Sequence, residues 1–127
     1  MDNHKKRILI IEADGEMRSF LKDFLEDEGY EVDSASYGPD RFCKLVRQSF
    51  NLIITDIWMP GLKGLDILPG VKKLQPQAAI LVITSYGNHK FFRKAFERGA
   101  SAYLVKPIHL YTLRTVTHQL IYSTETV

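Results

Sequence analysis

Ile8-Leu9-Ile10-Ile11 is an unbroken apolar run close to the start of the chain, and three similar runs follow it. The other runs are Leu52-Ile53-Ile54, Ile80-Leu81-Val82-Ile83 and Tyr103-Leu104-Val105. Short apolar runs without alternation predict strands that are covered on both faces, as in the middle of a parallel sheet. A fifth segment, Glu31-Val32-Asp33-Ser34-Ala35, does alternate, and this predicts an edge strand with one exposed side.

Segments with helical spacing lie between the predicted strands. In the first, Asp14 is placed to cap the start of a helix and Gly29 to end it. The apolar stripe of this helix consists of Met17, Phe20, Leu21, Phe24 and Leu25. The second helix begins near Pro39, a residue that suits a first helical turn. It is expected to bury Phe42, Leu45 and Val46.

Three further helical segments complete the pattern. One carries Leu65, Leu68, Val71 and Leu74, with Pro69 inside it. Because proline lacks a backbone N–H and crowds the preceding turn, we expect Pro69 to kink or shorten this helix. The last two segments run over residues 88–98, closed by Gly99, and over residues 110–122. The chain therefore reads as five strand–helix units without a linker or an internal repeat.

This alternation predicts parallel strands joined by right-handed crossovers, with helices on both faces of the sheet. A length of 127 residues is typical of one domain, which we expect over residues 1–127 with an ordered core at about 7–123. The net charge of +2 is too small to predict direct nucleic-acid binding.

Several sequence features indicate the cellular compartment of the protein. The single cysteine, Cys43, cannot form an internal disulfide, and the first six residues lack the apolar stretch of a secretion signal. No apolar run approaches the roughly 20 residues of a membrane helix. These features predict a cytoplasmic protein without membrane attachment.

Polar residues follow each buried strand at the point where it ends. Glu12 and Asp14 follow the first strand, Asp56 the third, Thr84 the fourth and Lys106 the fifth. Because parallel strands end along one edge of a sheet, we expect these side chains to converge there, where open α/β sheets carry their sites. Each residue alone also has an ordinary explanation as a turn former, a strand-end hydroxyl, a solvated lysine or a helix cap.

Together these residue types fit phosphoryl transfer to a carboxylate. An aspartate nucleophile needs a divalent cation to offset its repulsion from the phosphoryl oxygens, and oxygen ligands suit Mg²⁺. A lysine and a hydroxyl would neutralise and hydrogen-bond the remaining oxygens. A haloacid-dehalogenase-like phosphatase would need a second aspartate at the position of Trp58, and a dinucleotide or flavin site would need more than Gly15 after the first strand.

Four blocks of the sequence carry a family resemblance. They are Ile8 to Asp14 (ILIIEAD), Leu52 to Gly64 (LIITDIWMPGLKG), Ile80 to Gly87 (ILVITSYG) and Gly99 to Pro107 (GASAYLVKP). In this order and spacing, the chain resembles the receiver domain of two-component response regulators over nearly its full length. The resemblance implies a flavodoxin-like, doubly wound (βα)₅ fold with a five-stranded parallel sheet in the order 2-1-3-4-5.

The resemblance also implies roles for individual residues. Asp56 is similar to the phospho-acceptor of these domains, Lys106 to the lysine that pairs with the phosphoryl group, and Thr84 to the switch hydroxyl. Tyr103 matches the aromatic switch position, and Trp58 would offer its backbone carbonyl to the metal. The Lys106–Pro107 bond would be cis.

The metal site departs from the family pattern after the first strand. Receiver domains usually place two adjacent acids there, and the second is a direct metal ligand. In this chain Glu12 fills the first position, but Ala13 fills the second and cannot coordinate a cation. Asp14 is the available substitute, although capping of the helix competes for its carboxylate. We therefore predict a weak Mg²⁺ site, with Glu12, Asp56 and the Trp58 carbonyl as ligands and Asp14 as a further candidate.

Two aromatic residues, Trp58 and Tyr86, occupy the positions two beyond Asp56 and two beyond Thr84. In this family these positions flank the route by which water reaches the phosphoryl group. Large rings there would slow hydrolysis of the phosphorylated state. The alternative is that both rings pack on neighbouring loops.

Two classes of function remain open. The first is a phosphorylation switch that takes a phosphoryl group from a histidine kinase or phosphotransfer protein. Its chemistry would be limited to gaining and losing phosphate on Asp56, without turnover of an external metabolite. The second is a pseudo-receiver, a phosphorylation-independent interaction module, which Ala13 favours.

The resemblance places the partner surface on the fourth helix, fifth strand and fifth helix. An output domain or a partner protein would bind there, and a dimer is compatible with this arrangement. The candidate contacts are Phe92, Arg93, Tyr111 and His118.

Overall fold

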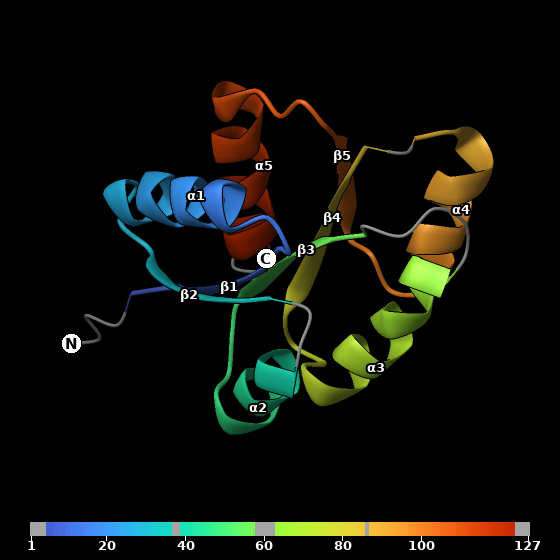
Figure 1. Ribbon diagram of the computed structural model, residues 1–127, viewed down its shortest axis with the longest axis horizontal. Helices are drawn as coiled ribbons and strands as arrows, with labels where there is room; N and C mark the ends of the chain where they lie inside the picture. The colour runs from blue at the N-terminus through green and yellow to red at the C-terminus, as the bar shows by residue number, and fades with distance from the viewer. Residues whose placement is uncertain (1–4, 37–38, 58–62, 86, 124–127) are drawn as a thin grey trace.

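Strands and helices alternate in the computed structural model, which describes residues 5–36, 39–57, 63–85 and 87–123 (Figure 1). The strands are β1 (Arg7–Ile11), β2 (Glu31–Ala35), β3 (Leu52–Asp56), β4 (Ala79–Thr84) and β5 (Ala102–Val105). The helices are α1 (Gly15–Asp27), α2 (Pro39–Arg47), α3 (Ile67–Leu74), α4 (His89–Glu97) and α5 (Leu110–Tyr122), with a short 3₁₀ helix, η1 (Lys63–Asp66), ahead of α3. The predicted succession of elements is confirmed.

All strand pairs are parallel, and the strand order is β2-β1-β3-β4-β5. At the carboxyl edge Asp56 pairs with Ile83, and Thr84 pairs with Val105. The ends of the last three strands therefore lie side by side. The flavodoxin-like order is confirmed, and β2 is an edge strand as its alternating sequence predicts.

Helices cover both faces of the sheet: α1 and α5 lie on one side, and α2, α3 and α4 on the other (Figure 1). Successive strand residues point to opposite faces. Ile8 and Ile10 accordingly pack in the same cluster as Leu21 of α1, whereas Leu9 and Ile11 pack with residues of α2, α3 and α4. Two apolar layers thus hold the strand ends in fixed positions.

The helical stripes are wider than the part that touches the sheet. Three residues expected in these stripes are exposed instead: Phe20 to 52%, Val46 to 68% and Leu74 to 42%. Only the centre of an apolar stripe can meet the flat surface of a sheet, so positions at its margin remain in water. Leu21 and Leu45, which lie at the centre of their stripes, are fully buried as predicted.

The predicted helix signals act as expected. The Asp14 Oδ1 accepts hydrogen bonds from the backbone N–H of Glu16 (3.0 Å) and of Met17 (3.3 Å), and so caps α1. Gly29 follows the helix at a φ of 100°. Pro69 is the third residue of α3, where a missing N–H costs nothing, and α3 is only 8 residues long.

None of the helices within the described part of the chain is both long and apolar enough to cross a membrane. The Lys106–Pro107 peptide bond is cis, as the family resemblance implies.

Candidate functional site

Lys106 joins two carboxylates at the carboxyl edge of the sheet. Its Nζ lies 2.8 Å from Asp56 Oδ2 and 3.1 Å from Glu12 Oε1. The three residues are separated by up to 94 positions in the sequence, yet the ends of β1, β3 and β5 bring them together. The predicted convergence of carboxylates and ammonium is therefore present.

Burial removes most of the water from around the charged groups of this cluster. Glu12 is 1% exposed and Asp56 3%, so neither carboxylate is well hydrated. Burial raises the pKa of Asp56, the hydrogen bond from Lys106 opposes this, and the nearby charge of Glu12 adds to it, so that the pKa reaches about 6. One ammonium between two carboxylates leaves the cluster one positive charge short.

Lys106 is held as a cation. Burial alone would lower the pKa of its ammonium, but the hydrogen bonds that it donates to Asp56 and Glu12 outweigh this and raise it. The residue is therefore protonated at neutral pH. A fixed cation 2.8 Å from Asp56 Oδ2 is placed to stabilise additional negative charge at that oxygen.

Hydrogen bonds to both the side chain and the backbone of Glu12 hold the turn between β1 and α1. Glu12 Oε2 accepts a hydrogen bond from the backbone N–H of Asp14 (3.0 Å), while its backbone oxygen accepts one from Arg18 Nη1 (2.6 Å). The Arg18 Nη1 also lies 3.4 Å from the backbone oxygen of Ala13. These contacts fix the turn, and both carboxylate oxygens of Glu12 accept hydrogen bonds.

Thr84 is fully buried at the end of β4. Its Oγ1 donates a hydrogen bond to the backbone oxygen of Ile57 (3.0 Å), the residue after Asp56. The backbone N–H of Lys106 donates to the Thr84 oxygen at 2.7 Å. Thr84 therefore links the chain segments that carry Asp56 and Lys106.

Tyr103 belongs to an aromatic cluster on β5 and α4. Its ring centroid lies 4.0 Å from that of Phe92 and 5.8 Å from that of Phe91, both edge to face. Burial raises the pKa of the Tyr103 hydroxyl to about 12. The ring is thus partly enclosed on the side of the sheet that α4 covers.

Within the described part of the chain, two of the predicted magnesium ligands lie close together at this edge. Glu12 and Asp56 form the oxygen-rich pair that Mg²⁺ prefers, but Ala13 supplies no ligand and Asp14 is engaged as the cap of α1. Among the residues that the structure describes, no group of three histidine, cysteine, aspartate or glutamate side chains is arranged to hold a metal ion. Trp58 and Tyr86 lie outside the described residues.

The predicted partner contacts lie on the expected elements. Arg93 of α4 is exposed, as are Tyr111 (76%) and His118 of α5. Phe92 is half-buried, because its ring packs on Tyr103. Val105 at the end of β5 adds an exposed apolar side chain to this surface.

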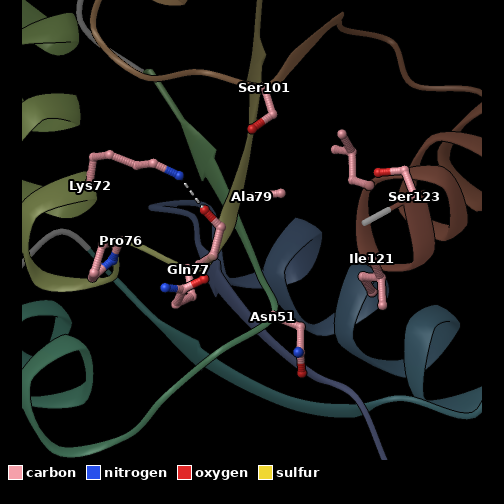
Figure 2. A pocket seen from close by; sticks show the side chains of 10 residues that line it. Asn51, Lys72, Pro76, Gln77, Ala79, Ser101, Ile121 and Ser123 are labelled. Atoms are coloured by element: carbon pink, nitrogen blue, oxygen red, sulfur yellow. Dashed lines mark hydrogen bonds between the residues drawn. The ribbon is translucent and has the colours of Figure 1, made fainter. Parts of the chain in front are cut away.

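A cavity of about 360 Å³ lies at the opposite, amino edge of the sheet (Figure 2). Asn51, Ala79 and Ser101 near the strand starts form part of its wall. Ile121 of α5 and Ser123, just beyond the end of that helix, close it. Lys72 Nζ reaches in from α3 and donates to the Ala78 oxygen at 2.7 Å. The strands separate this cavity from Asp56, so it takes no part in the carboxylate cluster.

Arg18 and Gly87 make contacts that the sequence alone did not reveal. Arg18 had a signal, because a cation near the start of a helix opposes the helix dipole and needs a partner elsewhere. Gly87 had no such signal, since it resembles any loop glycine. An ideal Cβ on Gly87 would lie only 2.7 Å from Val105 Cγ2.

Comparison with known proteins gives a consistent result. A model of the response regulator receiver domain matches residues 8–118. The chemotaxis protein CheY of Thermotoga maritima is 33% identical over 103 residues, which cover 80% of this chain and 86% of CheY. The transcriptional regulatory protein ResD of Bacillus subtilis is 28% identical over 104 residues, or 82% of this chain, but this chain spans only 43% of ResD.

Solved structures of response regulators are also similar in fold to this chain. A response regulator protein from Burkholderia pseudomallei, described with a phosphorylated aspartic acid, calcium ion and citrate, has a TM-score of 0.79 and 26% identity. The match covers 96% of this chain and 75% of that one. The beryllofluoride-activated NtrC4 receiver domain dimer has a TM-score of 0.83 and 27% identity, with coverage of 92% and 97%.

Proposed function

Because the chain belongs to the response regulator receiver domain family of two-component signalling, we propose that Asp56 is its phospho-acceptor and that phosphorylation there switches a partner surface. The observation that carries this proposal is the position of Lys106, which donates to both Asp56 and Glu12 in a buried cluster. A purely structural ion pair would need one carboxylate, whereas two carboxylates around one ammonium create a site that attracts further positive charge.

Asp56 supplies the nucleophile. One of its carboxylate oxygens forms a bond to phosphorus while the phosphorus–nitrogen bond of the donor's phosphohistidine breaks, and the leaving imidazole takes up a proton. Only the ionised carboxylate can attack. With a pKa of about 6, Asp56 is largely ionised at neutral pH and available for the reaction.

Lys106 and Thr84 stabilise the product. The Lys106 ammonium, already 2.8 Å from Asp56 Oδ2, can pair with the phosphoryl oxygens by a small movement. The Thr84 hydroxyl would leave Ile57 and donate to the same group, since a hydroxyl carries one proton and cannot serve both acceptors fully. This movement of Thr84 is the proposed switching step, and Tyr103 would follow it inward.

Receiver domains typically bind Mg²⁺, and we propose that this chain binds it weakly. Asp56, Glu12 and the Trp58 carbonyl would hold the ion, with Asp14 as the remaining candidate once its cap is released. When bound, the ion supplies positive charge that offsets the repulsion between Asp56 and the phosphoryl oxygens. The deficit of positive charge at the cluster supports some affinity, and the absence of an acid at position 13 limits it.

Membership of this family implies a kinase partner, and we propose that a histidine kinase or phosphotransfer protein is the donor. We also propose that residues 1–127 form one receiver domain whose α4, β5 and α5 surface contacts an output domain or a partner protein. Exposed Arg93, Tyr111 and Val105 support this surface. The NtrC4 receiver is described as a dimer, so self-association is a further form that the contact could take.

One observation favours a second candidate function, the pseudo-receiver. The β1–α1 turn is already fixed by Arg18 and by the Glu12–Asp14 hydrogen bond, so the fold does not depend on a metal ion to order this turn. Such a module would bind its partner equally well with and without phosphate on Asp56.

Tryptophan fluorescence tests the two candidates against each other. Trp58 is the only tryptophan and lies two residues beyond Asp56 in the sequence. We expect a saturable change when Mg²⁺ and then beryllofluoride, a phosphoryl mimic, are added to the wild type. The Asp56→Asn variant should show no response to beryllofluoride. If the fluorescence of folded wild-type protein does not change at any Mg²⁺ concentration, the proposal that Asp56 is a phospho-acceptor is rejected. The pseudo-receiver is then the remaining candidate function.

A further inference from the structure

Charge is unevenly distributed over the fold, although the net charge is only +2. Residues 14–28, which form α1 and its two caps, include six acidic and two basic residues. Residues 67–98, which contain α3, β4 and α4, include six basic residues and one acidic residue. Because α1 and the pair of α3 and α4 cover opposite faces of the sheet, opposite charges gather on opposite sides of the molecule (Figure 1).

The outer side of α1 combines carboxylates with an exposed aromatic ring. Its acidic face consists of Glu16, Phe20, Asp23 and Asp27, four exposed residues at helical spacings of three or four. Phe20 is 52% exposed. Within the described part of the chain, Asp23 and Asp27 take part in no ion pair, so their charges are available to a partner. Large aromatic rings are enriched in protein interfaces, so this face is suited to binding another protein.

A groove of about 420 Å³ lies between α3 and α4 on the other side of the sheet. Three residues of α3 and three from the end of α4 line this α3–α4 groove: Pro69, Lys72, Lys73, Glu97, Arg98 and Gly99. The methylene groups of Lys72 lie against Gly99, where an ideal Cβ would be 3.4 Å from Lys72 Cβ and 3.5 Å from its Cγ. The Lys72 Nζ is engaged by the Ala78 oxygen at 2.7 Å. Pro69 and the Lys72 methylene groups thus give the groove an apolar wall that suits an aromatic ring.

Cations border the α3–α4 groove on both helices. Lys73 is exposed on α3, and Lys94 lies one helical turn before Arg98 on the same side of α4. The Arg98 Nη1 is 3.1 Å from Asp66 Oδ1, so this cation is already paired. Glu97 offsets only one of the six basic charges of residues 67–98. Lys73 and Lys94 have no ion pair among the residues that the structure describes, which leaves two positive charges to attract an acidic partner.

We infer that this chain associates head to tail with further copies of itself, through the acidic face of α1 in one copy and the α3–α4 groove in the next. The Phe20 ring would enter the groove, while Asp23 and Asp27 would pair with Lys73 and Lys94. Ion pairs at the rim of an interface contribute mainly to specificity and association rate, so we expect weak binding that salt weakens further. Neither surface contains a residue of the phosphoryl site, so the inference goes beyond the proposed function.

The positions of the two surfaces determine the form of the assembly. Because they lie on opposite sides of the sheet, they cannot meet within one molecule (Figure 1). A contact between two different surfaces leaves one of each free at the ends, so further copies add unless the assembly closes into a ring. A symmetric dimer through α4, β5 and α5 would instead stop at two copies.

Sedimentation velocity of the wild-type protein tests the association. We expect the average mass to rise beyond that of a dimer as the protein concentration increases. The dissociation constant for adding one copy should increase at least about tenfold between about 0.01 M and about 1 M salt, because the screening length falls from about 30 Å to about 3 Å.

Two variants block one surface each. Asp23→Lys/Asp27→Lys reverses the charge of the acidic face, and Lys73→Ala/Lys94→Ala removes the unpaired cations of the groove. Each variant alone should be monomeric under conditions in which the wild type associates. In an equimolar mixture, the intact acidic face of one variant should bind the intact groove of the other, and growth should stop at a one-to-one dimer.

Glu28→Lys/Glu31→Lys is the matched control. It changes the net charge by the same amount as Asp23→Lys/Asp27→Lys, but outside the acidic face. Both carboxylates already have partners within the chain, Glu28 in Arg114 and Glu31 in Arg7. Because these pairs are at the surface and contribute little to stability, the control should fold and should still associate as the concentration increases.

A wild type that stays monomeric at low salt would overturn the inference, even if the groove binds an acidic peptide or a nucleic acid. Growth that stops at a dimer, or that survives either blocking variant, would also overturn it, because a different contact would then hold the copies together. A mixture of the two folded variants that stays monomeric, or a control that no longer associates, would contradict the pairing of these two surfaces.

Discussion

The two sides of the Asp56 cluster differ in how much of the family's chemistry they retain. On the side of β3, β4 and β5, Asp56, Lys106 and Thr84 are all present, buried or half-buried, and joined by hydrogen bonds. On the side of the β1–α1 turn, Ala13 has no ligand atom and Asp14 is engaged as a cap. We therefore propose a complete phosphoryl-binding side beside a reduced metal-binding side, two functions that mutation can separate.

Removal of Lys106 should have the largest effect on the complete side. Lys106→Ala leaves two buried carboxylates without their ammonium, and breaking a buried pair in this way costs about 3 to 5 kcal/mol. We expect the free energy of unfolding, measured in urea, to fall by about this amount. Lys22→Ala is the matched control, because its pair with Glu26 is exposed and should contribute under 1 kcal/mol. Equal losses in the two variants would contradict the buried cluster.

The pH dependence of stability should reveal the strain on Asp56. Its folded-state pKa of about 6 exceeds the ordinary value of 3.8, so the folded protein holds a proton that the unfolded chain has lost between these values. This contribution stabilises the fold at low pH and is lost as the pH rises from about 4 to 6. At 1.36 kcal/mol for each pKa unit, the loss is at most about 3 kcal/mol.

Asp56→Asn removes this titration and isolates its effect. In metal-free buffer, the difference in free energy of unfolding between Asp56→Asn and the wild type should grow in favour of the variant between pH 4 and 7. Above pH 7 the difference should be constant. A difference that does not change over this range would show that Asp56 titrates normally.

Restoring an acid at position 13 should increase the affinity of the metal-binding side for Mg²⁺. Ala13 is exposed, so Ala13→Asp fits without repacking. We expect Mg²⁺ to bind about 10- to 100-fold more tightly, since even an indirect partner of a metal contributes this much. Calorimetric titration with Mg²⁺ measures it, with Ala13→Asn as the uncharged control. An unchanged affinity would mean that another group already fills this role.

The smallest expected effect concerns Asp14. Because Asp14 caps α1, Asp14→Ala should lower the free energy of unfolding by about 1 kcal/mol. The affinity for Mg²⁺ should be unchanged. A tenfold loss of Mg²⁺ affinity would instead identify Asp14 as a ligand that gives up its cap when the ion binds.

The fold was predictable from sequence because strands buried on both faces leave short unbroken apolar runs, and here these runs alternate with segments of helical spacing. The same runs place Glu12, Asp56 and Lys106 at strand ends, so their convergence followed from the parallel topology. The exposed Phe20 and Val46 could not be foreseen, because periodicity identifies an apolar stripe but not how much of it meets the sheet.

Other features of the site depend on tertiary geometry alone. That the Thr84 hydroxyl donates to Ile57, and that Gly87 lies against Val105, are relations between segments at least 18 residues apart whose distances no local pattern encodes. The roles of Asp56, Lys106, Thr84 and Tyr103 remain predictions from the resemblance.

The most direct test of the difference between the two sides is the Mg²⁺ dependence of Asp56 phosphorylation by phosphoramidate. The phosphorylated fraction is measured by mass spectrometry of the intact protein. Phosphoramidate donates its phosphoryl group to Asp56 and releases ammonia, so no kinase is needed. We predict that the wild type is phosphorylated, and Asp56→Asn is not, with half-maximal rate at an Mg²⁺ concentration at least about tenfold higher than in Ala13→Asp. A wild type that is never phosphorylated, or that saturates at the same Mg²⁺ concentration as Ala13→Asp, would contradict a complete phosphoryl side beside a reduced metal side.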